Sequence, residues 1–343
     1  MIRKFTILFI LLNCVFVHSD EIVIADDHAP ISIMSDHMHK KNEFMFSYRF
    51  SSMEMSGLRN GISSISTEDT MTSPNGSSLS DGTYMNAPTS MNMSMHMFGM
   101  MYAPSDNLTL LIMGNYKQKE MTQQRMNMSG SARFNVNSQG FGDVMLGSMF
   151  GIKNNKDLKI HLGLGLSLPT GSIDKRDDIP TGSNKRLGYN MQNGSGTWDP
   201  YALLNFRKKI HEIKYGAQFF YKVRPGDSNN YGYKYGNFLD TNIWTSYNFI
   251  NFLSASFKIN FKSLNKMKGY DNALNARMSP AMDAGNIGYK KVLLGLGFNF
   301  INQNSFLKDQ RFAIEIIKPI YEKYNRIQMK QSLKVMMGLQ YAL

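Results

Sequence analysis

From Phe44 to the end of the chain, apolar residues alternate with polar or small residues in short runs. In Leu158–Leu168, leucine or isoleucine occupies every second position, and Lys159, His161, Gly163, Gly165 and Ser167 lie between. A period of two places successive side chains on opposite faces, so each run predicts a strand with one apolar face. About twelve such runs occur: Phe44–Phe50, Met91–Met97, Leu108–Tyr116, Val144–Ile152, Leu158–Leu168, Trp198–Phe206, Ile213–Val223, Ile243–Phe249, Leu253–Phe261, Val292–Phe300, Phe312–Ile316 and Leu333–Leu343.

The connections between these runs alternate between short and long. The short ones are 103–107, 153–157, 207–212, 250–252 and 302–310, and the long ones are 53–90, 117–140, 169–197, 225–238, 262–288 and 321–332. Short periplasmic turns and long extracellular loops are typical of outer-membrane barrels. We therefore predict an all-β fold, a transmembrane antiparallel up-and-down β-barrel of about twelve strands.

The N-terminus has the features of a secretory signal. Arg3 and Lys4 precede the apolar run from Phe5 to Val17, and we expect cleavage after Ser19, with Ala25 as the alternative. The predicted divisions are a signal peptide over 1–19, a polar periplasmic segment over 20–41 and the barrel over 42–343. The sequence does not show whether the segment 20–41 plugs the pore.

Composition narrows the class of protein. The chain has 343 residues, of which 19% are charged, and its mean hydropathy of −0.32 excludes a bundle of apolar transmembrane helices. The single cysteine, Cys14, lies in the signal peptide, so no disulfide framework or cysteine-based metal site is expected. A net charge of +12 favours contact with anionic lipid or anionic solutes. The sequence has no basic stripe interleaved with aromatic residues, which is the pattern typical of nucleic-acid binding.

The solvent decides which strand face points where. The lipid-facing side must be apolar, so leucine, phenylalanine, methionine and isoleucine are expected outside, and polar residues are expected in the lumen. The predicted pore-lining residues are Asn92, Ser94, His96, Lys159, His161, Gln218, Lys222, Arg224 and Asn299. Lys159, Lys222 and Arg224 would bias a pore toward anions.

Methionine and histidine suggest a metal-handling alternative. The thioethers of Met91, Met93, Met95 and Met97 are soft ligands suited to copper(I), although alternation also fits them to lipid. Near the start of the mature chain, His37, Met38 and His39 are candidate copper or zinc ligands, with His28 and Met34 upstream.

An enzymatic alternative is weaker. Ser94 and His96 share a strand face, as a nucleophile and its base would in a lipid hydrolase. No acidic partner or oxyanion donor is identifiable near them, so we expect no enzymatic activity and no cofactor. A structural or adhesion barrel with a closed lumen is the remaining alternative.

Several segments resemble a known family. They are His37–Lys41, Phe44–Phe50, Met101–Asp106, Leu168–Asp174 and the stretch Arg186–Asp199, which reads RLGYNMQNGSGTWD. Together they resemble the outer-membrane transporter family associated with the meta-pathway of phenol degradation. The resemblance covers the chain from about His37 to Leu343, and Gly188 and Asn190 depart from it where members often have proline.

The resemblance implies a barrel that moves small molecules, aromatic compounds among them, and brings no catalytic residues. The candidate loop residues are Asp174, Arg186 and Tyr189. Independently of the resemblance, the mixed charges of residues 174–186 could hold a cation, an anionic solute or lipopolysaccharide phosphate, but such loops are usually only solvated, and we favour that interpretation.

The sequence thus predicts an outer-membrane pore or transporter of a Gram-negative bacterium for passive uptake or export of small aromatic or anionic solutes. The expected partners are outer-membrane lipids and lipopolysaccharide, the solute, and the insertion machinery. That machinery would recognise the C-terminal strand, where Tyr341 is third from the last residue, Leu343.

Overall fold

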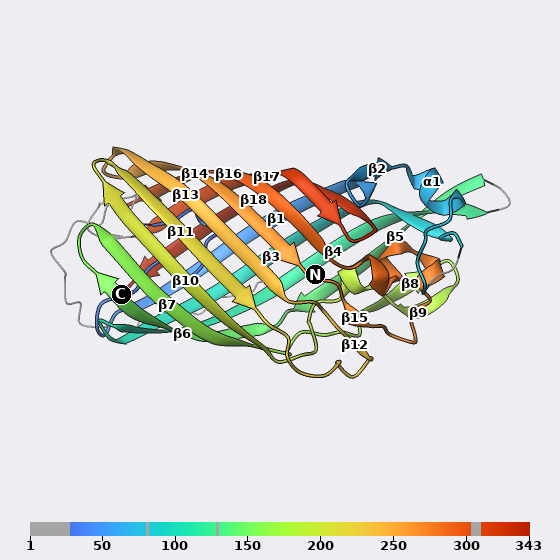
Figure 1. Cartoon of the computed structure of the whole chain (residues 1–343), viewed down its shortest axis with the longest axis horizontal. Coiled ribbons are helices and arrows are strands. Elements are labelled where there is room, and N and C mark those ends of the chain that lie inside the picture. Colours follow the sequence, from blue (N-terminus) through green and yellow to red (C-terminus); the bar gives the residue numbers. More distant parts are fainter. Residues whose placement is uncertain (1–27, 80–81, 128–129, 303–309) are drawn as a thin grey trace, which may run out of the picture.

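The computed structural model describes residues 28–79, 82–127, 130–302 and 310–343. The predicted signal peptide and residues 20–27 lie outside the described residues. Within those ranges the chain forms a closed antiparallel barrel of 12 strands (Figure 1). The barrel strands are β1 (Phe44–Asn60), β3 (Asn86–Ser105), β4 (Leu108–Asn127), β6 (Val144–Asn154), β7 (Leu158–Leu168), β10 (Asp199–Ile210), β11 (Ile213–Lys222), β13 (Phe238–Ile250), β14 (Leu253–Leu264), β16 (Tyr289–Ile301), β17 (Arg311–Tyr324) and β18 (Ile327–Ala342).

The barrel closes by pairing its first strand with its last. β1 runs antiparallel to β18 from Met45–Ala342 to Asn60–Ile327. The amide of Phe44 donates to the carbonyl of Leu343 at 2.9 Å, and the amide of Leu343 donates to Phe44 at 2.7 Å. Closure removes the unpaired edges that an open sheet would expose to lipid.

The two ends of the barrel differ (Figure 1). One end, called the turn end here, carries the C-terminus and the connections between β3 and β4, β6 and β7, β10 and β11, and β13 and β14. The other, the loop end, carries short elements: β2 (Ser63–Ile65), α1 (Thr67–Thr72), β5 (Gly130–Phe141), β8 (Arg176–Ile179), β9 (Gly182–Arg186), η2 (Tyr189–Met191), β12 (Tyr233–Lys234), β15 (Lys268–Gly269), η3 (Ala276–Met278), η4 (Pro280–Met282) and η5 (Ala284–Asn286). No helix in the described ranges is long and apolar enough to cross a membrane.

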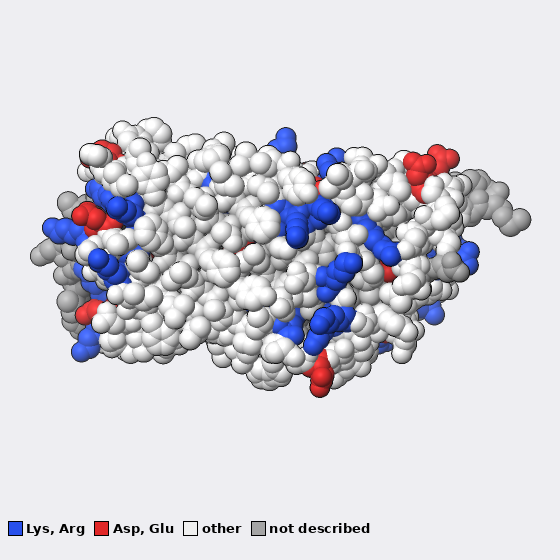
Figure 2. Space-filling view, in the orientation of Figure 1, with Lys and Arg blue, Asp and Glu red and all other residues white. Residues whose placement is uncertain are grey.

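The outer face carries a continuous apolar belt. Every barrel strand contributes at least one exposed large apolar side chain, for example Phe46, Phe98, Ile112, Leu146, Leu164, Leu204, Phe219, Ile243, Phe257, Leu296, Ile316 and Leu339. Figure 2 shows this belt as a zone almost without charge between the charged turn end and a region richer in lysine and arginine. This is the surface that a lipid-facing barrel requires.

The twelve predicted strands are confirmed in number and order, but two connections were wrong. Residues 117–140 were predicted to be a loop, and they extend β4 into a hairpin with β5. Residues 321–332 were also predicted to be a long loop, yet only Asn325 and Arg326 separate β17 from β18. Both errors have one cause: beyond the lipid belt the outer face meets water, so the alternation that marks a strand fades while pairing continues.

Candidate channel lumen

The inner face of the wall is polar. In β17, Arg311, Ala313 and Glu315 point inward and are buried, while Phe312 and Ile316 point outward and are exposed. Other buried inward-facing polar residues are Arg49, His161, Asn205, Arg207, Gln218, Lys258 and Asn299. Sequence reasoning missed Arg49, Arg207, Lys258, Arg311 and Glu315 as lumen residues, although the same alternation would have found them.

Residues 28–43 precede β1 and are called the plug here; residues 28–39 fold back into the lumen, and residues 40–42 are exposed at the turn end. Wall side chains bind the plug backbone: His161 Nε2 is 2.9 Å from the Ser35 carbonyl oxygen, Asn205 donates to Asp36 O at 2.9 Å, and Gln218 donates to Met34 O at 2.8 Å. Arg311 also donates to the Ala29 carbonyl. A segment without regular secondary structure needs such partners because buried backbone groups must be hydrogen-bonded.

The apolar side chains of the plug are buried in separate clusters with residues of the wall. Ile31 packs with Met97, Ala313 and Met336, and Ile33 packs with Trp244. On the same strand as Ala313, Glu315 accepts from the amide of Ser32 at 2.9 Å and pairs with Lys258 at 2.6 Å. The plug is therefore fixed to the wall all round the lumen.

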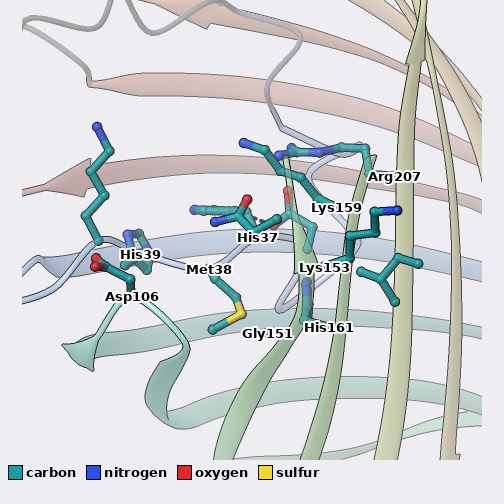
Figure 3. A pocket seen from close by; sticks show the side chains of 13 residues that line it. His37, Met38, His39, Asp106, Gly151, Lys153, Lys159, His161 and Arg207 are labelled. Atoms are coloured by element: carbon teal, nitrogen blue, oxygen red, sulfur yellow. Dashed lines mark hydrogen bonds and ion pairs between the residues drawn. The ribbon is translucent and has the colours of Figure 1, made fainter. Parts of the chain in front are cut away.

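A cavity of about 420 Å³ remains beside the plug (Figure 3). The plug contributes Asp36 to Lys40 to its lining, and the wall contributes His161 and Arg207. The charged and polar lining also includes Asp106, Lys153, Asn154 and Lys159. Among the described residues, four lysine or arginine side chains and two carboxylates therefore line this cavity, in addition to the histidines.

Histidines gather on the plug beside this cavity. The ring centroids of His28 and His37 are 4.6 Å apart, and those of His37 and His39 are 4.8 Å apart. His37 Nδ1 is 2.9 Å from Asp36 Oδ1, while His39 Nδ1 is 2.9 Å from Glu43 Oε1. Burial, followed by the nearby charge of Arg311, lowers the pKa of His28 well below its ordinary value, and burial also lowers the pKa of His37. Both rings are therefore neutral near pH 7.

The predicted metal ligands are only partly brought together. His37 and His39 are neighbours, but Met38 packs with Met45, Met101, Leu111 and Met149. Its sulfur points toward Gly151, away from the imidazoles (Figure 3). Met38 is therefore not placed as a ligand with them.

The orientation predicted for the methionine strand was wrong. In β3, Met97 is buried against the plug and Met91 is buried in a cluster at the loop end, so this face points inward. Asn92, Ser94 and His96 lie on the outer face, in register with Glu54, Ser52 and Phe50 of β1. They do not line the pore. Methionine suits either environment, and the polar outer positions near the loop end lie beyond the apolar belt.

Ser94 and His96 are also not arranged as a nucleophile and its base. The Ser94 hydroxyl donates to Gln118 at 3.2 Å, and His96 Nδ1 is 2.8 Å from the Tyr48 hydroxyl.

The other predicted lumen residues lie at different depths. Lys159, His161, Gln218 and Asn299 occupy inward-facing positions, and Lys222 is in register with inward-facing Tyr201. Arg224 lies just past β11 and pairs with Asp199 at 2.9 Å. Inward-facing glycines were expected to leave space, yet a Cβ at Gly165 would lie 2.3 Å from the Tyr201 ring, so tyrosine fills that space.

The predicted loop residues meet in a second layer across the loop end, called the cap here and comprising residues 169–198, 223–237 and 265–288. Arg186 pairs with Asp174 at 2.8 Å and with Asp271 at 2.7 Å, and its guanidinium lies 3.7 Å from the centroid of the Tyr231 ring. The amide of Asp271 donates to the Tyr189 hydroxyl at 3.0 Å. Three loops distant in sequence are thereby joined.

The cap has an apolar cluster and its own electrostatics. Tyr189, Tyr233, Leu274, Met282, Ala284 and Ile287 form one buried cluster. Partial burial raises the pKa of Asp174, but hydrogen bonds and charge from Arg186 and Arg176 outweigh burial, and the net pKa is lowered. Burial raises the pKa of Tyr189 to about 12, so its hydroxyl stays protonated.

Comparisons with known proteins agree with the fold. No family model and no curated protein matches this sequence. Among solved structures, an outer membrane channel from Pseudomonas putida F1 matches with a TM-score of 0.58 over 91% of this chain and 99% of that chain, at 9% identity. A TodX monoaromatic hydrocarbon channel mutant gives 0.43 over 90% and 91%, at 10% identity. A FadL homologue from Pseudomonas aeruginosa gives 0.40 over 88% and 90%, at 8% identity.

At such identities the likeness is one of fold. The chain has the fold of outer-membrane β-barrel channels, with a polar lumen that is occupied by its own N-terminal segment. Membership of the meta-pathway family stays a prediction, because no family model supports it.

Proposed function

We propose that this protein is a passive outer-membrane channel that favours small anionic solutes. The loop end faces outward and the turn end faces the periplasm. The observation that carries the proposal is the lining of the turn-end cavity, in which the described residues supply four cationic side chains and two carboxylates.

At the turn end, the cavity beside the plug has Lys40, Lys153, Lys159 and Arg207 in its lining, against Asp36 and Asp106. A ring of fixed positive charge lowers the energy of a permeating anion and raises that of a cation. A solute that moves inward would pass through this cavity last, just before it enters the periplasm.

At the loop end, two inward-facing lysines bind backbone carbonyls of the cap. Lys117 donates to Asn193 O at 2.8 Å, and Lys119 donates to Asn190 O at 2.9 Å and to Gln192 O at 2.6 Å. Carbonyl oxygens satisfy the ammonium hydrogen bonds without supplying a negative charge. The two lysines therefore contribute positive charge at the mouth, although the carboxylate of Asp143 acts on Lys117 in the opposite sense.

The barrel fold supports an outer-membrane location and the partners that go with it. The belt would contact outer-membrane lipids and lipopolysaccharide, and the terminal strand β18 would be recognised by the insertion machinery. A small aromatic carboxylate combines anionic charge with the aromatic compounds implied by the family resemblance, so benzoate is the solute to test first.

The test is the reversal potential of the refolded mature protein in a planar bilayer under a potassium chloride gradient, repeated with potassium benzoate. We expect anion preference, and Lys153→Glu with Lys159→Glu should move the reversal potential toward cations. The control is Lys208→Glu, compared with Lys159→Glu alone: it makes the same single charge reversal on the outer face of β10 near the turn end and should change nothing.

Cation preference in the unmodified protein would overturn the anionic assignment. A folded barrel that stays silent even without its plug would overturn the channel itself.

A further inference from the structure

The plug carries a cluster of nitrogen and oxygen donors that the channel proposal does not use. Ligand atoms of His28, Asp36 and His37 all lie within 4.8 Å of one another. Four histidines, at positions 28, 37, 39 and 161, lie in or beside the plug. Two imidazoles and a carboxylate at this spacing suit a single metal ion.

The individual contacts show which donor atoms are available. His28 Nδ1 is buried and has no hydrogen-bond partner among the described residues. Asp36 is held in place because its Oδ2 accepts from the amide of Ala29 at 2.8 Å, and its Oδ1 faces His37. A buried nitrogen without a partner is costly unless something binds it.

We infer that His28, Asp36 and His37 form a binding site for a divalent transition-metal ion, zinc in the first instance. Neutral imidazole nitrogen and carboxylate oxygen are ordinary zinc ligands, and three protein ligands leave one tetrahedral position for water. The donor set contains no thioether, because Met38 packs elsewhere, so it does not favour copper(I).

The position of the ion gives the site a consequence. His28 lies at the start of the described plug, and Asp36 and His37 lie on its return toward β1. A metal bound to all three would cross-link the two arms of the plug inside the lumen. Bound zinc therefore holds the plug in its folded form.

Some charges near the site oppose the binding of a cation, and others favour it. Arg311 lies close enough to His28 to disfavour a cation, and Arg207 acts in the same sense more weakly. The carboxylate of Asp36 offsets this repulsion within the ligand set. His39 is a neighbour outside the set, and its Nδ1 is engaged with Glu43.

The test is zinc titration of the chelator-treated, refolded full-length mature protein by isothermal calorimetry at pH 7, which requires no conductance. We expect one zinc per chain, lost in His28→Ala and in His37→Ala. His96→Ala is the matched control because that histidine lies on the outer wall, and it should bind like the unmodified protein. His39→Ala should keep the stoichiometry.

A second variant guards against loss of binding through misfolding of the plug. Asp36→Asn keeps an oxygen for the Ala29 amide and should weaken zinc at least tenfold while protease protection of the plug in metal-free protein is unchanged. The inference is overturned if the unmodified protein binds no zinc, or if binding survives both His28→Ala and His37→Ala. Because binding is read without transport, its failure would leave the channel proposal standing, and the converse also holds.

Discussion

The plug and the cap obstruct the two ends of one lumen by different means. The cap has an apolar cluster of its own and ion pairs between its loops, centred on Arg186. The plug has little apolar core of its own: its buried side chains pack on the wall, and its backbone is held by single side chains from separate strands.

The difference indicates which obstruction moves more easily. A layer with its own core loses that core when it opens, and this resists displacement. A segment held by separate contacts can leave by exchanging each one for water, at a net cost of ~1 kcal/mol per hydrogen bond. The plug is thus the better candidate for the movable part, and the cap for a fixed filter.

Deletion of residues 28–41 should have the largest effect on this comparison. With the cap left in place, we expect single-channel conductance to rise several-fold, because the segment fills the lumen between strands on opposite sides of the wall. The measurement is planar-bilayer recording, with heat-modifiable gel mobility as the check that the barrel is closed. Unchanged conductance would show that the cap, and not the plug, limits flow.

Removing Arg186 tests the cap. Arg186→Met leaves Asp271, whose side chain is 4% exposed, without its guanidinium partner. We expect the cap to lose ~1–3 kcal/mol of local stability, the usual range for a buried group left unsatisfied. Hydrogen exchange of residues 231–235 measures it.

Arg176→Met is the control for the cap, because Arg176 meets Asp174 at the surface, where exposed pairs contribute little. Equal effects of the two variants would contradict the central position given to Arg186. A faster exchange of the plug in Arg186→Met would contradict the independence of the two layers.

A single wall-to-plug contact is expected to matter less. Asn205→Leu removes the donor to Asp36 O and should weaken the plug by ~1 kcal/mol, raising its proteolysis rate about fivefold. Asn242→Leu is the matched control, since Asn242 also faces inward but donates to Asp240 on its own strand. If both variants behave alike, the plug is not held by these bonds.

The smallest expected effect is acid loosening of the cap. The pKa of Asp174 is lowered in the folded protein, so its ion pairs stabilise the cap above the unfolded pKa and are lost as pH falls through the folded value. The protection of residues 174–186 against hydrogen exchange, measured relative to the intrinsic exchange rate at each pH, should therefore fall below about pH 4. Asp174→Asn should remove this acid-dependent step, and a step that persists must come from other carboxyl groups.

Much of the barrel wall could be predicted from the sequence because contact with lipid requires apolar residues at every second position of a strand. Strands such as Leu158–Leu168 keep apolar residues at every second position, and the structure has a strand with those bounds. Where the outer face of a strand extends beyond the lipid, apolar residues at alternate positions are no longer required. That is why Asn92, Ser94 and His96 were assigned to the wrong face, and why β4 and β17 were predicted too short.

The lumen was harder to predict because its contacts join residues distant in sequence. His161 and Gln218 occupy lumen positions, but nothing in their neighbourhoods shows that they bind the carbonyls of Ser35 and Met34. His37 and His39 were noticed as a motif, whereas the place of Asp36 beside His28 depends on how the plug turns. Likewise, the contact between Arg186 and Asp271 exists only because two loops meet above the barrel.

The seam between β1 and β18 has a consequence for the order of folding. It joins residues ~300 positions apart, so it is among the least local contacts of the chain and among the slowest to form. Neighbouring hairpins can pair early, but the wall stays open until β18 reaches β1. The plug lies just ahead of β1, yet its partners on β7, β10, β11 and β17 come later in the chain. It is therefore among the first described segments to be synthesised and among the last to find its native contacts.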